Sequence, residues 1–396
     1  MNSSQLADVA PRERLIKGEK NWWFIGPRGI ARLQDEHLDA EGAVLPRVER
    51  SLRDQGLFEV PAYDSYALTV LTSTDCNLGC GYCFQNTEQD PSGGNRPPRI
   101  AHARLTPETT TSLLEFTDAR MAEAGLDKLT ILLFGGEPML NPKGCRDLLS
   151  RAADHGLVSA SMVSNGTLLT PLLAKELADL GLSSVQITFD GDREVHDHIR
   201  IKRSGGGTFD TIIANMAKVS AVTSIRWSLR VNVSHHNHTG LDKLVEQLGE
   251  AMDTSRCNIY FARVGDVGVG YENELLHTGL LADSFLRWQR RALELGFTVA
   301  RPRAQAPCQT CSFREGRFGA VVNADGVLAS CWETAGKPGL EVGTTATGYL
   351  PSAETEGRWQ SCEDFYRFSD EDRGLASFQN TVDAALLDHL SAVGRL

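Results

Sequence analysis

Three cysteines within one short stretch constrain this chain more than any other feature. They stand in Cys76-Asn-Leu-Gly-Cys80-Gly-Tyr-Cys83, a Cys-x3-Cys-x2-Cys spacing that can bring three sulfur atoms to one side of a tight loop. Four thiolates close a tetrahedral zinc site or an iron–sulfur cluster, whereas three leave one coordination position open for a small molecule. Gly79 and Gly81 flank Cys80 and let the backbone pass close to a bulky group. A structural zinc knuckle or a loop of reduced thiols is the alternative interpretation.

Length and composition narrow the class of protein. The chain of 396 residues is long enough for two or three structural units. The N-terminus has no apolar signal region and no stretch reaches ~18 apolar residues, so we expect neither secretion nor a membrane span. Nine cysteines without an export signal favour a reducing, cytoplasmic location and metal or catalytic roles over disulfides. The formal net charge of −11 disfavours a nucleic-acid partner, whose phosphates need a basic surface.

Residues 66–270 alternate predicted strands and helices. The strand candidates are short and rich in Val, Ile, Leu and Phe, as in a buried parallel sheet, and we expect them at Ala67–Thr72, Leu129–Phe134, Ala160–Ser164, Val185–Phe189, Ile225–Val233 and Ile259–Val264. The helix candidates lie at about 107–125, 143–156, 170–181, 208–221 and 240–252. Thr106-Pro107 and Thr170-Pro171 each suit an N-cap followed by proline at the first helical position. This α/β pattern predicts a partial (β/α)6 barrel, an open relative of the eight-stranded TIM barrel.

Polar motifs follow the carboxyl ends of these strands, where barrel enzymes form their active sites. In chain order they are the cysteine loop, Gly135-Gly-Glu-Pro138, Ser164-Asn-Gly166, Asp190-Gly191, Asn232 and Arg263. Any one of them alone is weak, because Asn-Gly and Asp-Gly are ordinary turn pairs. Six motifs at six strand ends predict one functional site.

The cysteine spacing, with Tyr82 before the third thiol, resembles the Cys-x3-Cys-x-aromatic-Cys signature of the radical S-adenosylmethionine (radical SAM) superfamily. The resemblance implies that Cys76, Cys80 and Cys83 hold a [4Fe–4S] cluster whose open iron binds S-adenosylmethionine (SAM). One electron from a flavodoxin- or ferredoxin-type donor then splits SAM into methionine and a 5′-deoxyadenosyl radical. In this family that radical takes a hydrogen atom from an unactivated C–H bond.

Two further stretches match the same superfamily. Gly135-Gly-Glu-Pro138 looks like its glycine-rich motif, which binds the amino group of SAM and so implies that role for Gly135, Gly136 and Glu137. Residues 186–200 resemble a run of the subgroup that modifies peptides and proteins, although that subgroup usually has serine at the position of Thr188. By this match the further candidates for SAM contacts are Tyr82, Ser164, Thr188 and Arg200, the last for the carboxylate. A strand-to-helix turn and a surface ion pair are the alternatives for the first motif and for Arg200.

Residues 305–365 hold a second group of cysteines. Cys308 and Cys311 are spaced Cys-x2-Cys, and two apolar arms around Asn323–Gly326 predict a β-hairpin that leads to Cys331. The Cys-x14-Gly-x4-Cys spacing resembles the first half of the auxiliary-cluster domain of the same subgroup, called SPASM with two clusters and twitch with one. With Cys362 as a fourth ligand, we expect one auxiliary [4Fe–4S] cluster. A zinc ribbon is the alternative.

The flanking segments carry less information. Residues 1–65 contain a short strand candidate from Asn21 and an amphipathic helix candidate from Val44 to Leu57, and they form either a cap on the barrel or a peptide-recognition segment. Residues 271–304 contain a bridging helix candidate from Gly279 to Leu295, and residues 366–396 form a helical tail.

The resemblance implies an enzyme that oxidatively modifies or crosslinks a ribosomally made precursor peptide. A radical SAM dehydrogenase or epimerase acting on a small molecule, such as a sugar or antibiotic precursor, is the second hypothesis. A zinc-binding interaction module on a barrel scaffold is the hypothesis without catalysis. The sequence identifies no catalytic base.

Overall fold

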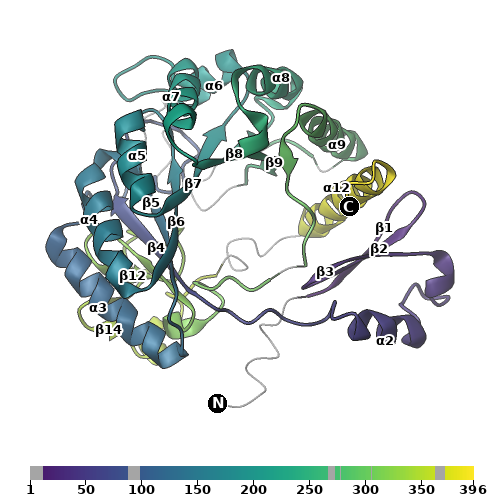
Figure 1. Cartoon of the computed structure of the whole chain (residues 1–396), viewed down its shortest axis with the longest axis horizontal. Coiled ribbons are helices and arrows are strands. Elements are labelled where there is room, and N and C mark those ends of the chain that lie inside the picture. The colour runs from purple at the N-terminus through teal and green to yellow at the C-terminus, as the bar shows by residue number, and fades with distance from the viewer. Residues whose placement is uncertain (1–11, 88–98, 266–272, 277, 305, 362–370) are drawn as a thin grey trace.

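The computed structural model describes residues 12–87, 99–265, 273–276, 278–304, 306–361 and 371–396. Six parallel strands form its centre, in the order in which they occur along the chain: β4 (Tyr66–Ser73), β5 (Leu129–Gly135), β6 (Leu157–Ser164), β7 (Leu182–Phe189), β8 (Arg226–Val233) and β9 (Cys257–Arg263). The six predicted strands and the α/β class are confirmed. The sheet is curved, and its helices lie on the outer, convex side (Figure 1).

The connecting helices are α3 (Pro107–Ala124), α4 (Pro142–Ala152), α5 (Pro171–Asp179), α6 (Arg193–Ile199), α7 (Phe209–Val222) and α8 (Leu241–Ala251). Both predicted caps are present, because the Thr106 and Thr170 hydroxyls accept hydrogen bonds from the N–H groups of Thr109 and Leu173. The sequence did not predict α6, which is shorter than two full turns. The core between sheet and helices includes Leu133, Ile187 and Leu229, all fully buried. None of the helices described is long and apolar enough to cross a membrane.

The sheet continues beyond the six central strands at both edges. At one edge β10 (Thr298–Val299), which follows α9 (Gly279–Glu294), pairs in parallel with β9. At the other edge β11 (Gly319–Val322) pairs in parallel with β4 and forms the predicted hairpin with β12 (Val327–Ala329), followed by β13 (Glu341–Thr344) and β14 (Gly348–Tyr349). The segment with the second group of cysteines, which also contains α10 (Ser352–Thr355), therefore extends the barrel sheet.

The two terminal segments pack against each other. A three-stranded antiparallel sheet of β1 (Arg14–Lys17), β2 (Trp22–Gly26) and β3 (Gly29–Leu33) precedes α2 (Pro46–Asp54), so the short strand and the helix expected there are present. The long C-terminal helix α12 (Glu371–Ala392) lies beside this sheet and beside α9 (Figure 1). Asp388 of α12 accepts a hydrogen bond of 2.9 Å from the Trp23 indole. Short 3-10 helices lie at Asp35–His37, Pro138–Leu140, Ala153–His155, His238–Gly240, Thr254–Arg256 and Arg314–Gly316.

Candidate functional site

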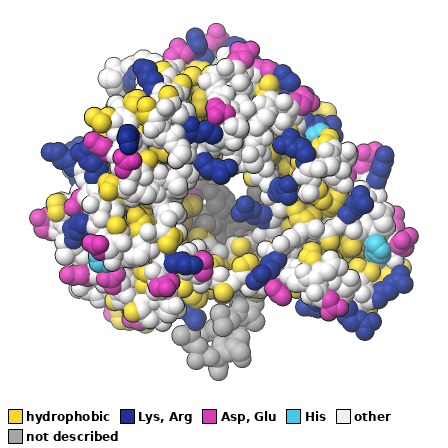
Figure 2. All heavy atoms as spheres, viewed as in Figure 1, with side chains coloured by type: hydrophobic (Ala, Val, Ile, Leu, Met, Phe, Trp, Pro, Cys, Tyr) yellow, Lys and Arg dark blue, Asp and Glu magenta, His cyan; other side chains and the backbone are white. Residues whose placement is uncertain are grey.

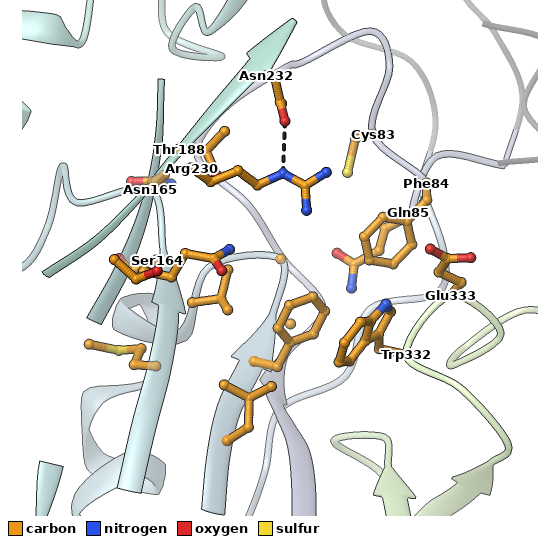
Figure 3. Close-up of a pocket in the computed structure, with 18 of the residues that line it drawn as sticks. Cys83, Phe84, Gln85, Ser164, Asn165, Thr188, Arg230, Asn232, Trp332 and Glu333 are labelled. Carbon is orange, nitrogen blue, oxygen red and sulfur yellow. Dashed lines mark hydrogen bonds between the residues drawn. The ribbon is translucent and has the colours of Figure 1, made fainter. Parts of the chain in front are cut away.

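A cavity of about 580 Å³ lies at the carboxyl ends of the central strands. The predicted cofactor residues that line it are Tyr82, Gly135, Gly136, Ser164, Thr188 and Arg200. Figure 3 shows Ser164 and Thr188 of this set, together with Cys83 of the cysteine loop. Figure 2 shows Lys and Arg side chains around the central hollow of one face of the molecule. The fold thus brings residues from distant parts of the chain to one pocket, as the strand-end motifs predicted.

The cysteine loop directly follows β4 and rests on the segment after α6. The Gly79 N–H donates to the Ile201 carbonyl at 3.0 Å, which anchors the loop between Cys76 and Cys83. Burial raises the pKa of Cys76 and raises that of Cys80 to about 12, so these thiols favour protonation until a cation compensates their charge. Within the described residues no group of three His, Cys, Asp or Glu side chains is arranged as a metal-ion site. Cluster binding by the three cysteines therefore stays a residue-level prediction.

Arg99 lies against the cysteine loop, although no sequence motif pointed to it. One of its terminal nitrogens lies 3.5 Å from the Cys83 sulfur, and the other donates to Gln85 Oε1 at 2.7 Å and to the Thr74 carbonyl at 3.2 Å. The guanidinium thus places a positive charge beside the thiols, where it favours the thiolate form that ligates iron.

Gly135 and Gly136 lie at the end of β5, where its backbone approaches the backbone of residues 73–75 too closely for a side chain. A Cβ atom on Gly135 would lie 2.2 Å from the Ser73 carbonyl oxygen, and one on Gly136 would lie 2.2 Å from that of Asp75. Gly135 also has a φ of +129°, which side chains rarely adopt. These glycines therefore let β5 support the residues that lead into Cys76, a reason that the sequence did not reveal.

Glu137 is fully buried and connects the ends of β5 and β6. Its Oε1 accepts from the Met139 N–H at 3.0 Å and from the Ser164 hydroxyl at 2.8 Å, and its Oε2 accepts from the Asn165 N–H at 2.7 Å. Burial raises the pKa of Glu137, and these three donors oppose that shift. The carboxylate is thus engaged by the protein itself, and its predicted contact with the SAM amino group stays a prediction.

Four side chains from four separate segments form a buried network at the edge of the pocket. The Tyr82 hydroxyl donates to Asp190 Oδ2 at 2.8 Å and accepts from Arg200 at 2.7 Å and from the Asn232 amide at 3.0 Å. Arg200 also pairs with Asp190 Oδ2 at 3.2 Å, with side chains 11% and 2% exposed. Asp190 and Asn232 stood among the strand-end motifs, but the sequence did not show that they meet Tyr82 and Arg200.

Arg200 provides a test of whether the pocket suits SAM. Its Nε–H is buried and has no acceptor among the described residues, although its other contacts hold the guanidinium at the pocket wall. A carboxylate is the acceptor that an arginine edge binds best. The residues present therefore fit the carboxylate of SAM at Arg200, and Ser164 and Thr188 line the same pocket.

The second group of cysteines lies behind one wall of this pocket. Cys311 and Cys331 are buried, and Cys308 lines a smaller cavity of about 230 Å³. Trp332, next to Cys331, lines both cavities and stacks on Phe134 with ring centroids 5.9 Å apart. Cys362, the fourth predicted ligand, lies outside the described residues. The auxiliary cluster therefore stays a prediction.

Comparison with known proteins agrees with the chemistry of the site. The profile of the Radical SAM superfamily matches residues 70–248. The radical SAM cyclopropyl synthase TigE of Paramaledivibacter caminithermalis is 20% identical over 83% of this chain and 67% of its own length. The PqqA peptide cyclase of Bradyrhizobium diazoefficiens is 34% identical over 30% of this chain and 27% of its own length. The chain thus spans about two thirds of the first relative and about a quarter of the second.

A solved structure shares the fold. The structure of anSMEcpe with bound AdoMet superposes with a TM-score of 0.59 at 16% sequence identity, covering 83% of this chain and 99% of that one. The matched region contains the three-cysteine loop and every strand-end motif up to Asn232. Residues 70–248 of this chain thus match the Radical SAM superfamily of iron–sulfur enzymes, and the similarity to the cyclopropyl synthase TigE agrees with that match.

Proposed function

We propose that this enzyme oxidatively modifies or crosslinks a ribosomally synthesised precursor peptide. The observation that supports this proposal most is the position of Trp332, beside Cys331 and in the lining of both cavities. In this proposal SAM and the substrate meet in the larger cavity, and the second group of cysteines next to it supports an oxidative outcome. The name of the PqqA peptide cyclase, to which part of this chain is similar, adds support for a peptide substrate.

The proposed cofactors divide the chemistry between two sites. Cys76, Cys80 and Cys83 would hold a [4Fe–4S] cluster that is reduced by a flavodoxin- or ferredoxin-type donor and, with SAM, supplies a 5′-deoxyadenosyl radical. Cys308, Cys311, Cys331 and Cys362 would hold a second cluster, which supplies a one-electron acceptor. Balanced for one oxidation, the peptide loses one hydrogen atom to the 5′-deoxyadenosyl group and then one proton and one electron. The chain's own part is to bind SAM through Arg200, Ser164 and Thr188 and to shield the reacting centre from water.

The test is mass spectrometry of a candidate precursor peptide, encoded beside this gene, after anaerobic reaction with SAM and a reductant. We expect 5′-deoxyadenosine together with a peptide lighter by about 2 Da per oxidation, the mass of two hydrogens. An unchanged peptide, with SAM still cleaved, would contradict the peptide proposal and favour the small-molecule hypothesis.

Metal analysis tests the two cysteine groups separately. We expect about eight irons per chain in the wild type and about four after Cys76→Ala, Cys80→Ala and Cys83→Ala are combined, because each full cluster holds four irons. A triple variant with zinc and no iron would indicate a structural zinc site in the second group. A colourless wild type with zinc alone would instead support the interaction-module hypothesis.

A further inference from the structure

Arg230 extends into the pocket from the middle of the barrel wall. Along β8 the side chains alternate, so Ser228, Arg230 and Asn232 line the pocket while Leu229 and Val231 are fully buried in the core. Arg230 Nε donates to Asn232 Oδ1 at 2.8 Å, and this bond directs the rest of the guanidinium into the cavity (Figure 3). Arg230 also makes a side-chain hydrogen bond with Tyr260, which lines the same cavity, and the end of its guanidinium faces the cavity.

The charge of the pocket wall is unusual for such an acidic chain. Its described lining contains three arginines and one carboxylate, Glu333, whereas the formal net charge of the whole chain is −11. Arg200 pairs with Asp190, and Arg263 donates to the backbone carbonyls of Asn273 and Leu275. Arg230, in contrast, has no Asp or Glu within 4.0 Å in the part of the chain that the structure describes. Among the described residues, Arg230 is thus a positive charge without a carboxylate partner.

Gln85 provides a second donor at the same pocket. It is 2% exposed, and its Oε1 accepts from Arg99 at 2.7 Å. Because arginine only donates, this contact fixes the orientation of the amide and turns Nε2 away from Arg99. Nε2 is buried without an acceptor among the described residues, and Figure 3 shows Gln85 and Arg230 reaching into the same cavity. Both side chains thus offer hydrogen-bond donors to an oxygen ligand in this cavity.

We propose that Arg230, assisted by Gln85, binds a carboxylate of the substrate and so makes the pocket selective for an anionic group. This inference rests on the proposed function, in which the carboxylate is either an Asp or Glu side chain of the peptide or its C-terminus. A guanidinium binds a carboxylate through two parallel hydrogen bonds, which fixes orientation as well as affinity. Bound in this way, the substrate is held in one orientation in the cavity that Arg230 lines.

The carboxylate of SAM itself is a less suitable partner. SAM has one carboxylate, and Arg200 at the strand ends already presents a buried Nε–H without an acceptor. Arg230 precedes Asn232 by two residues, which places its Cα about 7 Å deeper in the barrel at ~3.3 Å per strand residue. Arg200 and Arg230 thus enter the pocket from different segments, and their guanidinium groups are available to two different carboxylates.

The experiment measures binding of three labelled tripeptides to the full-length protein with SAM, by equilibrium dialysis under anaerobic conditions. The probes are acetyl-Gly-Glu-Gly-amide, acetyl-Gly-Gln-Gly-amide and acetyl-Gly-Gln-Gly with a free C-terminus. We expect one of the two acidic probes to bind roughly ten- to a hundredfold more tightly than the neutral one, the range of a hydrogen bond to a charged group. The tighter probe identifies whether a side chain or a C-terminus is recognised.

Variants then assign the preference to Arg230. Arg230→Gln should remove the difference between acidic and neutral probes, and Arg230→Lys should retain part of it because the charge remains. Arg226→Gln is the matched control, since Arg226 lies exposed on the same strand outside this pocket. Dialysis with labelled SAM in the absence of peptide should give the same affinity for all four proteins.

Three results would overturn the inference. The first is equal binding of the three probes, or no binding of any of them. The second is an unchanged preference for the acidic probe in Arg230→Gln. The third is a loss of SAM affinity in that variant, which would assign Arg230 to the cofactor site. Glutarate, a dicarboxylate without peptide bonds, separates this inference from the proposed function. If glutarate binds in an Arg230-dependent way while no peptide is modified, the carboxylate site stands and the peptide proposal fails.

Discussion

The buried ion pair between Asp190 and Arg200 allows the sharpest test of how the site is held together. Asp190→Ala would leave the Arg200 guanidinium, whose side chain is 11% exposed, without its carboxylate at 3.2 Å. Removing one partner of a buried pair costs about 3–5 kcal/mol, because the other charge stays desolvated. Arg200 keeps its 2.7 Å bond to the Tyr82 hydroxyl, so we expect the lower end, about 3 kcal/mol of unfolding free energy.

The assay is urea unfolding of the cofactor-free protein followed by tryptophan fluorescence, since bound SAM would add its own stabilisation. The double variant Asp190→Ala with Arg200→Met removes both charges and should recover about 1 kcal/mol or more of the loss, because no charge is left buried. Asp242→Ala is the control. Its partner Arg287 lies 2.9 Å away with both side chains about half exposed, and such surface pairs contribute at most about 1 kcal/mol. If Asp190→Ala costs no more than Asp242→Ala, or if the double variant is less stable than the single one, the buried-charge argument is wrong.

Three further predictions follow from single contacts. Gly136→Ala should lower the stability and iron content of the protein, because the new Cβ would lie 2.2 Å from the Asp75 carbonyl; a fully loaded variant with wild-type stability would contradict this. Burial and the nearby Arg200 charge lower the pKa of His196 well below its usual value. Because the unfolded state therefore binds the proton more readily, the free energy of unfolding should fall as the pH drops below about 6.5, by at most about 1.4 kcal/mol per pH unit. Denaturant titrations of wild type and His196→Phe between pH 7 and about 5 check this, and parallel slopes would refute it. Arg99→Gln removes the positive charge 3.5 Å from the Cys83 sulfur. Because a nearby positive charge favours the reduced cluster, this variant should lower the reduction potential of the cluster reconstituted on Cys76, Cys80 and Cys83, measured by EPR-monitored titration. An unchanged or higher potential would refute an electrostatic role of Arg99.

Much of the architecture was predictable because its signals are local in the chain. The alternation of short apolar strands with amphipathic helices reports burial along each element, so the six central strands and all connecting helices except the short α6 were expected. The hairpin of β11 and β12 was expected from its turn residues. The parallel pairing of β11 with β4 was not, because pairing between strands distant in sequence leaves no periodic signal in either of them.

The candidate site shows the same division. The spacing of Cys76, Cys80 and Cys83, with Tyr82 in the aromatic position, is readable from the sequence alone and led to the superfamily. Only the folded chain shows that the Tyr82 hydroxyl meets Asp190. Only the folded chain also shows that no carboxylate of the described residues pairs with Arg230, because this depends on which side chains of other strands share the cavity. Residue types and spacings thus determine what chemistry the chain can support, whereas the curvature and pairing of the sheet decide which groups meet, since these contacts join residues that are far apart along the chain.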